Sequence, residues 1–109
     1  LHTPGHTPGS QCFRVRNTLV SGDTLFVDGC GRVDLPGSNP DEMYESLQKL
    51  CALPDETILL PGHNYSAVPN ATMGDTKRSN GYLRFPDLAA WQRAMGSGPV
   101  PDPRNEAPD

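Results

Sequence analysis

Apolar and polar residues along this chain follow the pattern of several short strands. Residues 11–16 alternate apolar and polar side chains, which predicts a half-buried strand, and a tight turn at Asn17-Thr18 leads to a second strand at 18–20. Residues 25–27 are apolar, and residues 56–60 predict a short buried strand. The last three of these segments each run into a corner that contains glycine, where polar side chains gather.

One longer segment carries the end signals of a helix. Asn39 is a good N-cap, Pro40 suits the first helical position, and Pro54 stops the helix. Its apolar face has helical spacing and comprises Met43, Leu47, Leu50 and Cys51. Residues 66–81 are polar, and we expect them to be irregular.

A last short helix begins after Asp87 and ends at Gly96. Its apolar face comprises Leu88, Trp91 and Met95, and we expect Trp91 and Met95 to belong to the core. Residues 97–109 contain four prolines and little that could be buried, which predicts a disordered tail. The chain is therefore divided into one α/β domain at 1–96 and a proline-rich tail at 97–109.

Composition narrows the possible partners and compartment. The chain has 109 residues and a net charge of −4, which argues against nucleic acid as a partner. No apolar run approaches the roughly 20 residues of a membrane-spanning helix, so a membrane partner is not expected either. The three cysteines are widely spaced and form no Cys-x-x-Cys pair, which favours a reducing, cytoplasmic location.

Three corners share one design that suits a metal site. His6 follows Pro4-Gly5 in a loop made rigid by two Thr-Pro-Gly units, Asp23 follows Gly22, and His63 follows Pro61-Gly62. Two imidazoles and one carboxylate suit Zn²⁺, Fe²⁺ or Mn²⁺, with zinc or iron favoured. The separations in sequence are long, so the residues alone leave open that these are ordinary polar residues of loops.

Four motifs, at residues 3–10, 21–26, 29–32 and 60–63, resemble those of the metallo-β-lactamase-fold hydrolases. Within that superfamily they look most like the glyoxalase II (hydroxyacylglutathione hydrolase)-like branch, over residues 1 to about 96. The resemblance implies the C-terminal half of an αββα sandwich, a mixed sheet with flanking helices, whose N-terminal half is missing. It also implies that the missing half carries a His-x-His-x-Asp-His motif that supplies the remaining metal ligands.

The resemblance also implies roles for single residues. His6 matches a ligand of the first metal, Asp23 the carboxylate that bridges two metals and orients the nucleophile, and His63 a ligand of the second metal. Tyr65 matches a position near the thiol-carrying part of the substrate, and Arg32 a basic position that contacts substrate. The cofactor so implied is a pair of Zn²⁺ ions, with Fe²⁺ as the alternative.

Other polar residues have less certain tasks. Lys77 and Arg78, with Arg84, are candidates to pair with a carboxylate of an acidic thiol substrate, although a solvated surface explains Lys77 and Arg78 slightly better. Asp28 is expected to shape a turn, and Cys30, between two glycines, is expected to be a small packed residue rather than a nucleophile.

Three functions follow from these observations. The first is a metal-dependent hydrolase that directs a metal-bound hydroxide at a small-molecule thioester or related ester bond. The second is a mononuclear-iron persulfide dioxygenase, because Asp34 stands where glyoxalase II proper has an aromatic residue. The third is a non-catalytic piece that docks with a missing half or another protein. In each case we expect the chain alone to be inactive, marginally stable and to expose one apolar face of its sheet.

Overall fold

Four short strands form one mixed sheet in the order β1-β2-β3-β4 in the computed structural model, which describes residues 1–26, 29–62 and 71–100. The strands are β1 (Phe13–Val15), β2 (Thr18–Gly22), β3 (Ile58–Pro61) and β4 (Ala71–Thr72). β2 and β3 pair in parallel, and the outer strands pair antiparallel to them. This is the mixed sheet that the sequence predicted. Of its two central strands, β2 comes from the first half of the chain and β3 from the second.

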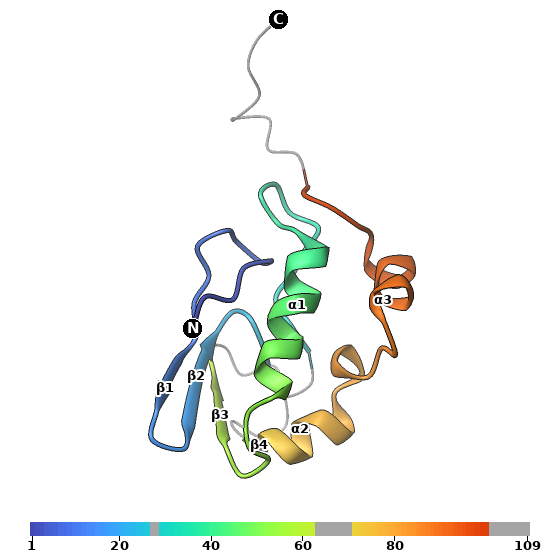
Figure 1. Cartoon of the computed structure of the whole chain (residues 1–109). Coiled ribbons are helices and arrows are strands. Elements are labelled where there is room, and N and C mark those ends of the chain that lie inside the picture. Colours follow the sequence, from blue (N-terminus) through green and yellow to red (C-terminus); the bar gives the residue numbers. More distant parts are fainter. Residues whose placement is uncertain (27–28, 63–70, 101–109) are drawn as a thin grey trace, which may run out of the picture.

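Helices lie together on one side of the molecule and the strands on the other (Figure 1). α1 (Pro40–Cys51) begins as predicted, since the Asn39 side chain accepts the Glu42 backbone N–H at 3.2 Å. Its apolar face packs on the inner face of the sheet. The buried cluster comprises Cys12, Leu19, Leu25, Val33, Met43, Leu47, Leu50, Leu59, Met73 and Trp91.

The last helix, α3 (Leu88–Met95), is fastened to the start of α1. The Trp91 indole is fully buried, and its Nε1–H donates to the Pro40 carbonyl at 2.7 Å. Phe85 packs edge-on against the same indole, with ring centroids 5.3 Å apart. The predicted core role of Trp91 and Met95 is therefore confirmed, Met95 being partly buried against the cluster.

The prediction of an irregular segment over 66–81 is wrong for its described part. Residues 71–72 form β4, α2 (Met73–Ser79) follows at once, and a 3₁₀ turn, η1 (Gly81–Leu83), comes next. The Thr72 hydroxyl accepts the Asp75 backbone N–H at 3.2 Å and so caps α2. Met73 and Thr76 are buried, so two side chains anchor a helix whose remaining residues are mostly polar.

Part of the predicted tail contacts the domain. Val100 donates its N–H to the Ser38 carbonyl at 2.7 Å and accepts the Gly37 N–H at 3.1 Å. Gly96 and Gly98 both have positive φ, 92° and 71°, which turns the chain back toward this loop after α3. Residues 101–109 lie outside the described residues, and the predicted disorder there stays a prediction.

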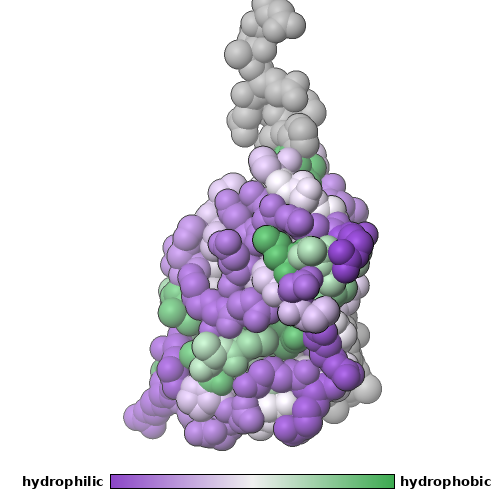
Figure 2. Space-filling view, turned by 45° about the vertical axis from the view of Figure 1, so that its right-hand side comes forward, coloured by the Kyte–Doolittle hydropathy of each residue, from purple (hydrophilic) through white to green (hydrophobic). Residues whose placement is uncertain are grey.

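Among the described residues, no helix lies against one face of the sheet. Phe13 pairs with Val20 and Val20 with Leu60, and Thr18 pairs with both Val15 and Ile58, so these side chains share a face. Phe13 is 60% exposed and Val15 62%. Val20, Ile58 and Leu60 are exposed as well. The apolar face expected from the sequence is present, whereas the helix side carries separate hydrophobic patches among hydrophilic residues (Figure 2).

Among the described residues, no helix is long and apolar enough to cross a membrane. The longest, α1, has 12 residues and a polar outer face.

The exposed face should determine how the chain behaves in solution. Replacing Phe13 and Val15 together with Thr keeps strand propensity and should lower both binding of the dye ANS and self-association of the chain. Fluorescence and sedimentation measure the two effects. As a control, Leu19→Ala in the neighbouring strand empties a buried site and should cost about 2–5 kcal/mol in unfolding free energy. Unchanged dye binding by the double variant would contradict this interpretation.

Candidate metal centre

The parallel pair β2 and β3 brings two predicted ligand loops to one edge of the sheet. Gly22 pairs with Pro61, and the Gly62 N–H donates to the Gly22 carbonyl at 2.7 Å. A Cβ at Gly62 would lie 3.0 Å from that carbonyl, so the two corners touch. Asp23 follows directly on one corner. His63 and Tyr65, which follow on the other, lie outside the described residues, and their predicted roles stay predictions.

The opening loop is fastened along α1. A Cβ at Gly5 would lie 2.5 Å from the backbone of Met43, so only glycine allows this approach. The Gly5 carbonyl accepts the Asn39 N–H at 2.7 Å, and the Pro4 carbonyl accepts the Ser46 hydroxyl at 2.6 Å. These contacts fix the position of the loop that carries His6 relative to the first turns of α1.

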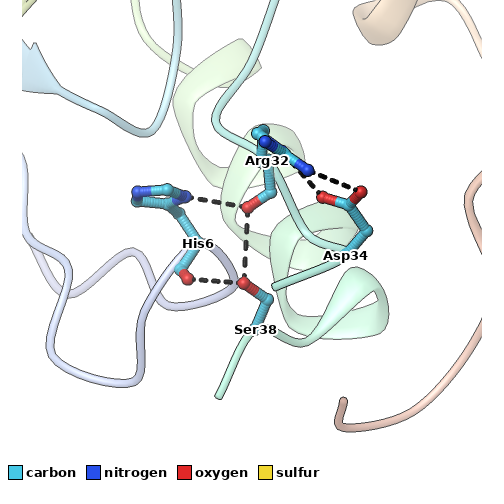
Figure 3. A network of polar contacts seen from close by, with 4 residues as sticks. All are labelled: His6, Arg32, Asp34 and Ser38. Carbon is cyan, nitrogen blue, oxygen red and sulfur yellow. Dashed lines mark hydrogen bonds and ion pairs between the residues drawn. The ribbon is translucent and has the colours of Figure 1, made fainter. Parts of the chain in front are cut away.

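The imidazole of His6 is oriented by the loop at 31–38. Its Nδ1 lies 2.8 Å from the Arg32 carbonyl oxygen, and since a carbonyl only accepts, Nδ1 carries the proton (Figure 3). The lone pair of the neutral ring is then on Nε2, the arrangement typical of histidines that bind metals. The half-buried His6 thus meets a requirement that the sequence could not test.

Gly31 brings His6 and Asp23 together. A Cβ at Gly31 would lie 2.0 Å from the Asp23 carbonyl oxygen and 3.0 Å from both Cβ and Cγ of His6. The Gly31 N–H also donates to the Thr24 carbonyl at 3.1 Å. Gly31 was known from its motif only as a neighbour of Arg32. The structure shows that it is the contact point between two predicted ligands.

The described residues include two of the three predicted ligands, His6 and Asp23. Among the described residues there is no group of three or more His, Cys, Asp or Glu side chains close enough to hold a metal ion. His6 and Asp23 provide one imidazole nitrogen and one carboxylate, a donor set that suits zinc or iron. Because such ions take four or more ligands, these two residues fit the implied metal and need further ligands to complete its site.

Arg32 and Asp34 form an exposed ion pair beside His6. Two hydrogen bonds of 3.0 Å join the guanidinium to the carboxylate. The hydrogen bond to Asp34 raises the pKa of Arg32, and the hydrogen bond from Arg32 lowers the pKa of Asp34. The pair lines a hollow of about 320 Å³, whose other walls are Val33, Tyr82, Ala94 and Met95. The guanidinium of Arg32 therefore lies at an open hollow, whereas its main-chain carbonyl contacts His6, which does not line that hollow.

Lys77 and Arg78 are not brought to this centre. Lys77 pairs with Asp55 and donates to the Cys51 carbonyl at 3.2 Å, at the end of α1 away from His6. The hydrogen bond from Lys77 lowers the pKa of the Asp55 carboxyl group. Arg78 pairs with Asp75 on its own helix, and Arg84 is exposed at the end of η1. Their contact with substrate stays a prediction that this arrangement does not favour.

Cys30 is the packed residue that the sequence predicted. It lies partly buried against the core, and burial raises its pKa to about 12. Since the thiolate is the nucleophilic form, this cysteine is unsuited to attack a substrate at neutral pH. Asp28, expected to shape the preceding turn, lies outside the described residues.

Gly31 should not tolerate a side chain. Gly31→Ala places a methyl group against backbone that cannot rotate away, and should cost about 1–3 kcal/mol or more in unfolding free energy. It should also move the NMR signals of His6 and Asp23. Gly9→Ala is the matched control, because nothing lies within 4 Å of a Cβ at Gly9. Equal stability of the two variants in denaturant unfolding would contradict the contact.

Cys30 should be nearly inert in the folded chain. A pKa of about 12 leaves on the order of a thousandfold less thiolate at pH 8 than an ordinary thiol has. Alkylation by iodoacetamide should therefore be slower by a comparable factor than in the urea-unfolded chain, as mass spectrometry of the Cys30 peptide can measure. Equal rates in the folded and unfolded chains would show that the thiol is accessible and ordinary.

The chain resembles curated hydrolases that are longer than it is. Hydroxyacylglutathione hydrolase of Aeromonas salmonicida is 46% identical over 96 residues, which cover 88% of this chain and 34% of that protein. A probable polyketide biosynthesis zinc-dependent hydrolase, BaeB, of Bacillus velezensis is 35% identical over 84 residues, covering 76% of this chain and 37% of that protein. The chain thus spans little more than a third of the length of these relatives.

Solved structures agree with the fold. ETHE1 from Myxococcus xanthus superimposes with a TM-score of 0.81 and 34% identity over 87% of this chain and 43% of its own. TTHA1623, solved in a di-iron-bound form, gives a TM-score of 0.69 and 42% identity over 76% of this chain and 41% of its own. Residues 1–63 match the model of the metallo-beta-lactamase superfamily. This match spans more than half of the chain, the predicted ligand loops included, and the chain therefore belongs to the metallo-beta-lactamase superfamily.

Proposed function

We propose that this chain provides part of the metal centre of a hydrolase that cleaves a thioester or related ester bond. The observation that carries the proposal is the orientation of His6, whose Nδ1 is occupied by the Arg32 carbonyl while Nε2 keeps its lone pair. The names of two relatives, a hydroxyacylglutathione hydrolase and a zinc-dependent hydrolase, support the same chemistry.

Three residues would hold the metal from this chain. His6 would offer Nε2, Asp23 would offer two carboxylate oxygens able to bridge two ions, and His63 would add a second imidazole. The remaining ligands would come from residues outside this chain. When bound, Zn²⁺ or Fe²⁺ supplies a hydroxide at neutral pH and polarises the carbonyl to be attacked. No Ser or Cys nucleophile is needed, in keeping with the inert Cys30.

Arg32 is the best-placed residue to bind the substrate. It stands at the open hollow, and its partner Asp34 is a surface carboxylate. An exposed ion pair contributes little stability, so a substrate carboxylate can replace Asp34 at small cost. Tyr65 stays proposed for the thiol-carrying part of the substrate. The hollow and its guanidinium suit a small acidic thioester.

An iron-dependent persulfide dioxygenase is the second candidate. Asp34, which pairs with Arg32, occupies the position where glyoxalase II proper has an aromatic side chain. The likeness to a protein solved in a di-iron-bound form keeps iron open as the metal. In this reaction His6 and Asp23 would bind iron, and His63 would not be a ligand.

A chimera can test the proposal. In it, this chain replaces the 96 matched residues of the Aeromonas salmonicida hydroxyacylglutathione hydrolase. The chimera should bind metal and hydrolyse a hydroxyacylglutathione thioester. His6→Ala and Asp23→Asn should each remove most of the bound metal and lower the activity at least 100-fold. Lys77→Ala, far from the centre, is the matched control and should keep both. Elemental analysis and a thioester assay give the readouts.

The same chimera separates the candidates. Consumption of oxygen with a persulfide substrate, in place of thioester cleavage, would support the dioxygenase. A folded chimera that holds metal independently of His6 and Asp23 would overturn both enzyme proposals and leave the docking role. Activity of the 109-residue chain alone would overturn the claim that ligands from outside it are required.

A further inference from the structure

Ser38 lies at the centre of the polar network around His6. Its side chain is 1% exposed, and its hydroxyl donates to the His6 carbonyl at 2.8 Å. The Arg32 carbonyl, which accepts the His6 Nδ1–H, lies 3.4 Å from the same oxygen (Figure 3). One hydroxyl thus contacts the main-chain carbonyls of both residues, His6 and Arg32, whose contact orients the imidazole.

Ser38 is itself held from two sides. Its carbonyl accepts the Val100 N–H at 2.7 Å, and its own N–H donates to the Leu35 carbonyl at 2.9 Å. The next residue, Asn39, donates its N–H to Gly5, one residue before His6, at 2.7 Å. The hydroxyl therefore projects from backbone that is fixed relative to the loop it supports.

We propose that Ser38 is a positioning residue for His6, setting the tautomer and direction in which the imidazole meets a metal. Its hydroxyl ties the His6 main chain to the loop of Arg32, so that the Nδ1–H reaches the Arg32 carbonyl and Nε2 stays unprotonated. The part that concerns metal binding rests on the function proposed above. The part that concerns the tautomer does not.

A purely structural role makes a different prediction, and Ser46 provides the comparison. Its hydroxyl is also nearly buried and donates to the same loop, at the Pro4 carbonyl at 2.6 Å. It lies against neither end of the His6–Arg32 contact. If any buried hydroxyl that fastens the loop were enough, Ser38→Ala and Ser46→Ala would have equal effects on His6.

The first measurement is the tautomer of His6 in the ¹⁵N-histidine-labelled chain at pH 8, read from the ring nitrogen shifts. The wild-type chain should show Nδ1 protonated, and an Nε2–H ring would overturn the proposal without any variant. Ser38→Ala should shift His6 toward the Nε2–H form, Ser46→Ala should not, and Ser38→Thr, which keeps the hydroxyl, should restore the wild-type signal. Amide spectra confirm that each variant is folded.

The second measurement is the affinity for Zn²⁺ alone, by calorimetry, of the chimera described above when it carries the same substitutions. Ser38→Ala should weaken binding about tenfold or more, as is usual when the partner of a metal-binding histidine is lost, while Ser46→Ala should leave it unchanged. Unaltered tautomer and affinity in Ser38→Ala would overturn the positioning role. Failure of the chimera with the wild-type sequence of this chain to bind Zn²⁺, while the tautomer responds to Ser38→Ala, would count against the proposed function and not against Ser38.

Discussion

The contact between Gly22 and Gly62 is the constraint on which the candidate site depends. Two parallel strands end at the same edge of a sheet. Here the last residue of β2 approaches the residue that follows β3, so that a Cβ at Gly62 would lie 3.0 Å from the Gly22 carbonyl. The hydrogen bond from Gly62 to Gly22 closes that edge. The loops that leave it, one of them bearing Asp23, start from a common point because neither corner carries a side chain.

A second layer of glycine contacts brings the opening loop to the same point. Gly5 rests on the backbone of α1, and Gly31 fits between Asp23 and His6. Each contact replaces a side chain by close backbone approach, and a methyl group at either position would force the loops apart. Glycine at these two positions therefore allows the backbones to pack closely. It lets the opening loop come within hydrogen-bond distance of both α1 with its N-cap and the loop at 31–38.

The sheet has two very different faces, and this bears on what the chain needs. On the inner face Leu19 and Leu59 are fully buried beneath α1, which also supports the His6 loop. On the outer face Phe13, Val15, Val20, Ile58 and Leu60 are exposed. An apolar face of this kind is typical of a surface that another layer of structure covers. An incomplete ligand set and an uncovered sheet face thus occur in the same described residues.

Local signals in the sequence were sufficient for elements whose ends and faces are encoded by near neighbours. Asn39-Pro40 begins α1 and Asp87 begins α3 because caps act within one turn, and helical spacing identified Met43, Leu47 and Trp91 as core. The prediction for residues 66–81 failed because Met73 and Thr76 provide the only buried side chains of α2, and their burial depends on distant residues. The helix propensity of the local sequence does not reveal such contacts.

For the site, the sequence alone identified the residue types and the glycine corners that carry His6, Asp23 and His63, because backbone turns of this kind require glycine locally. The family motifs pointed to Arg32 as well. Only the tertiary structure decided that Gly31 joins His6 to Asp23, that Arg32 and Ser38 orient the imidazole, and that Lys77 and Arg78 pair with other partners. The contacts of His6 with Gly31, Arg32 and Ser38 join segments 25 or more residues apart. The ion pairs of Lys77 and Arg78 are choices between competing partners. They are determined by how the sheet and α1 pack, and no local pattern of residues encodes that packing.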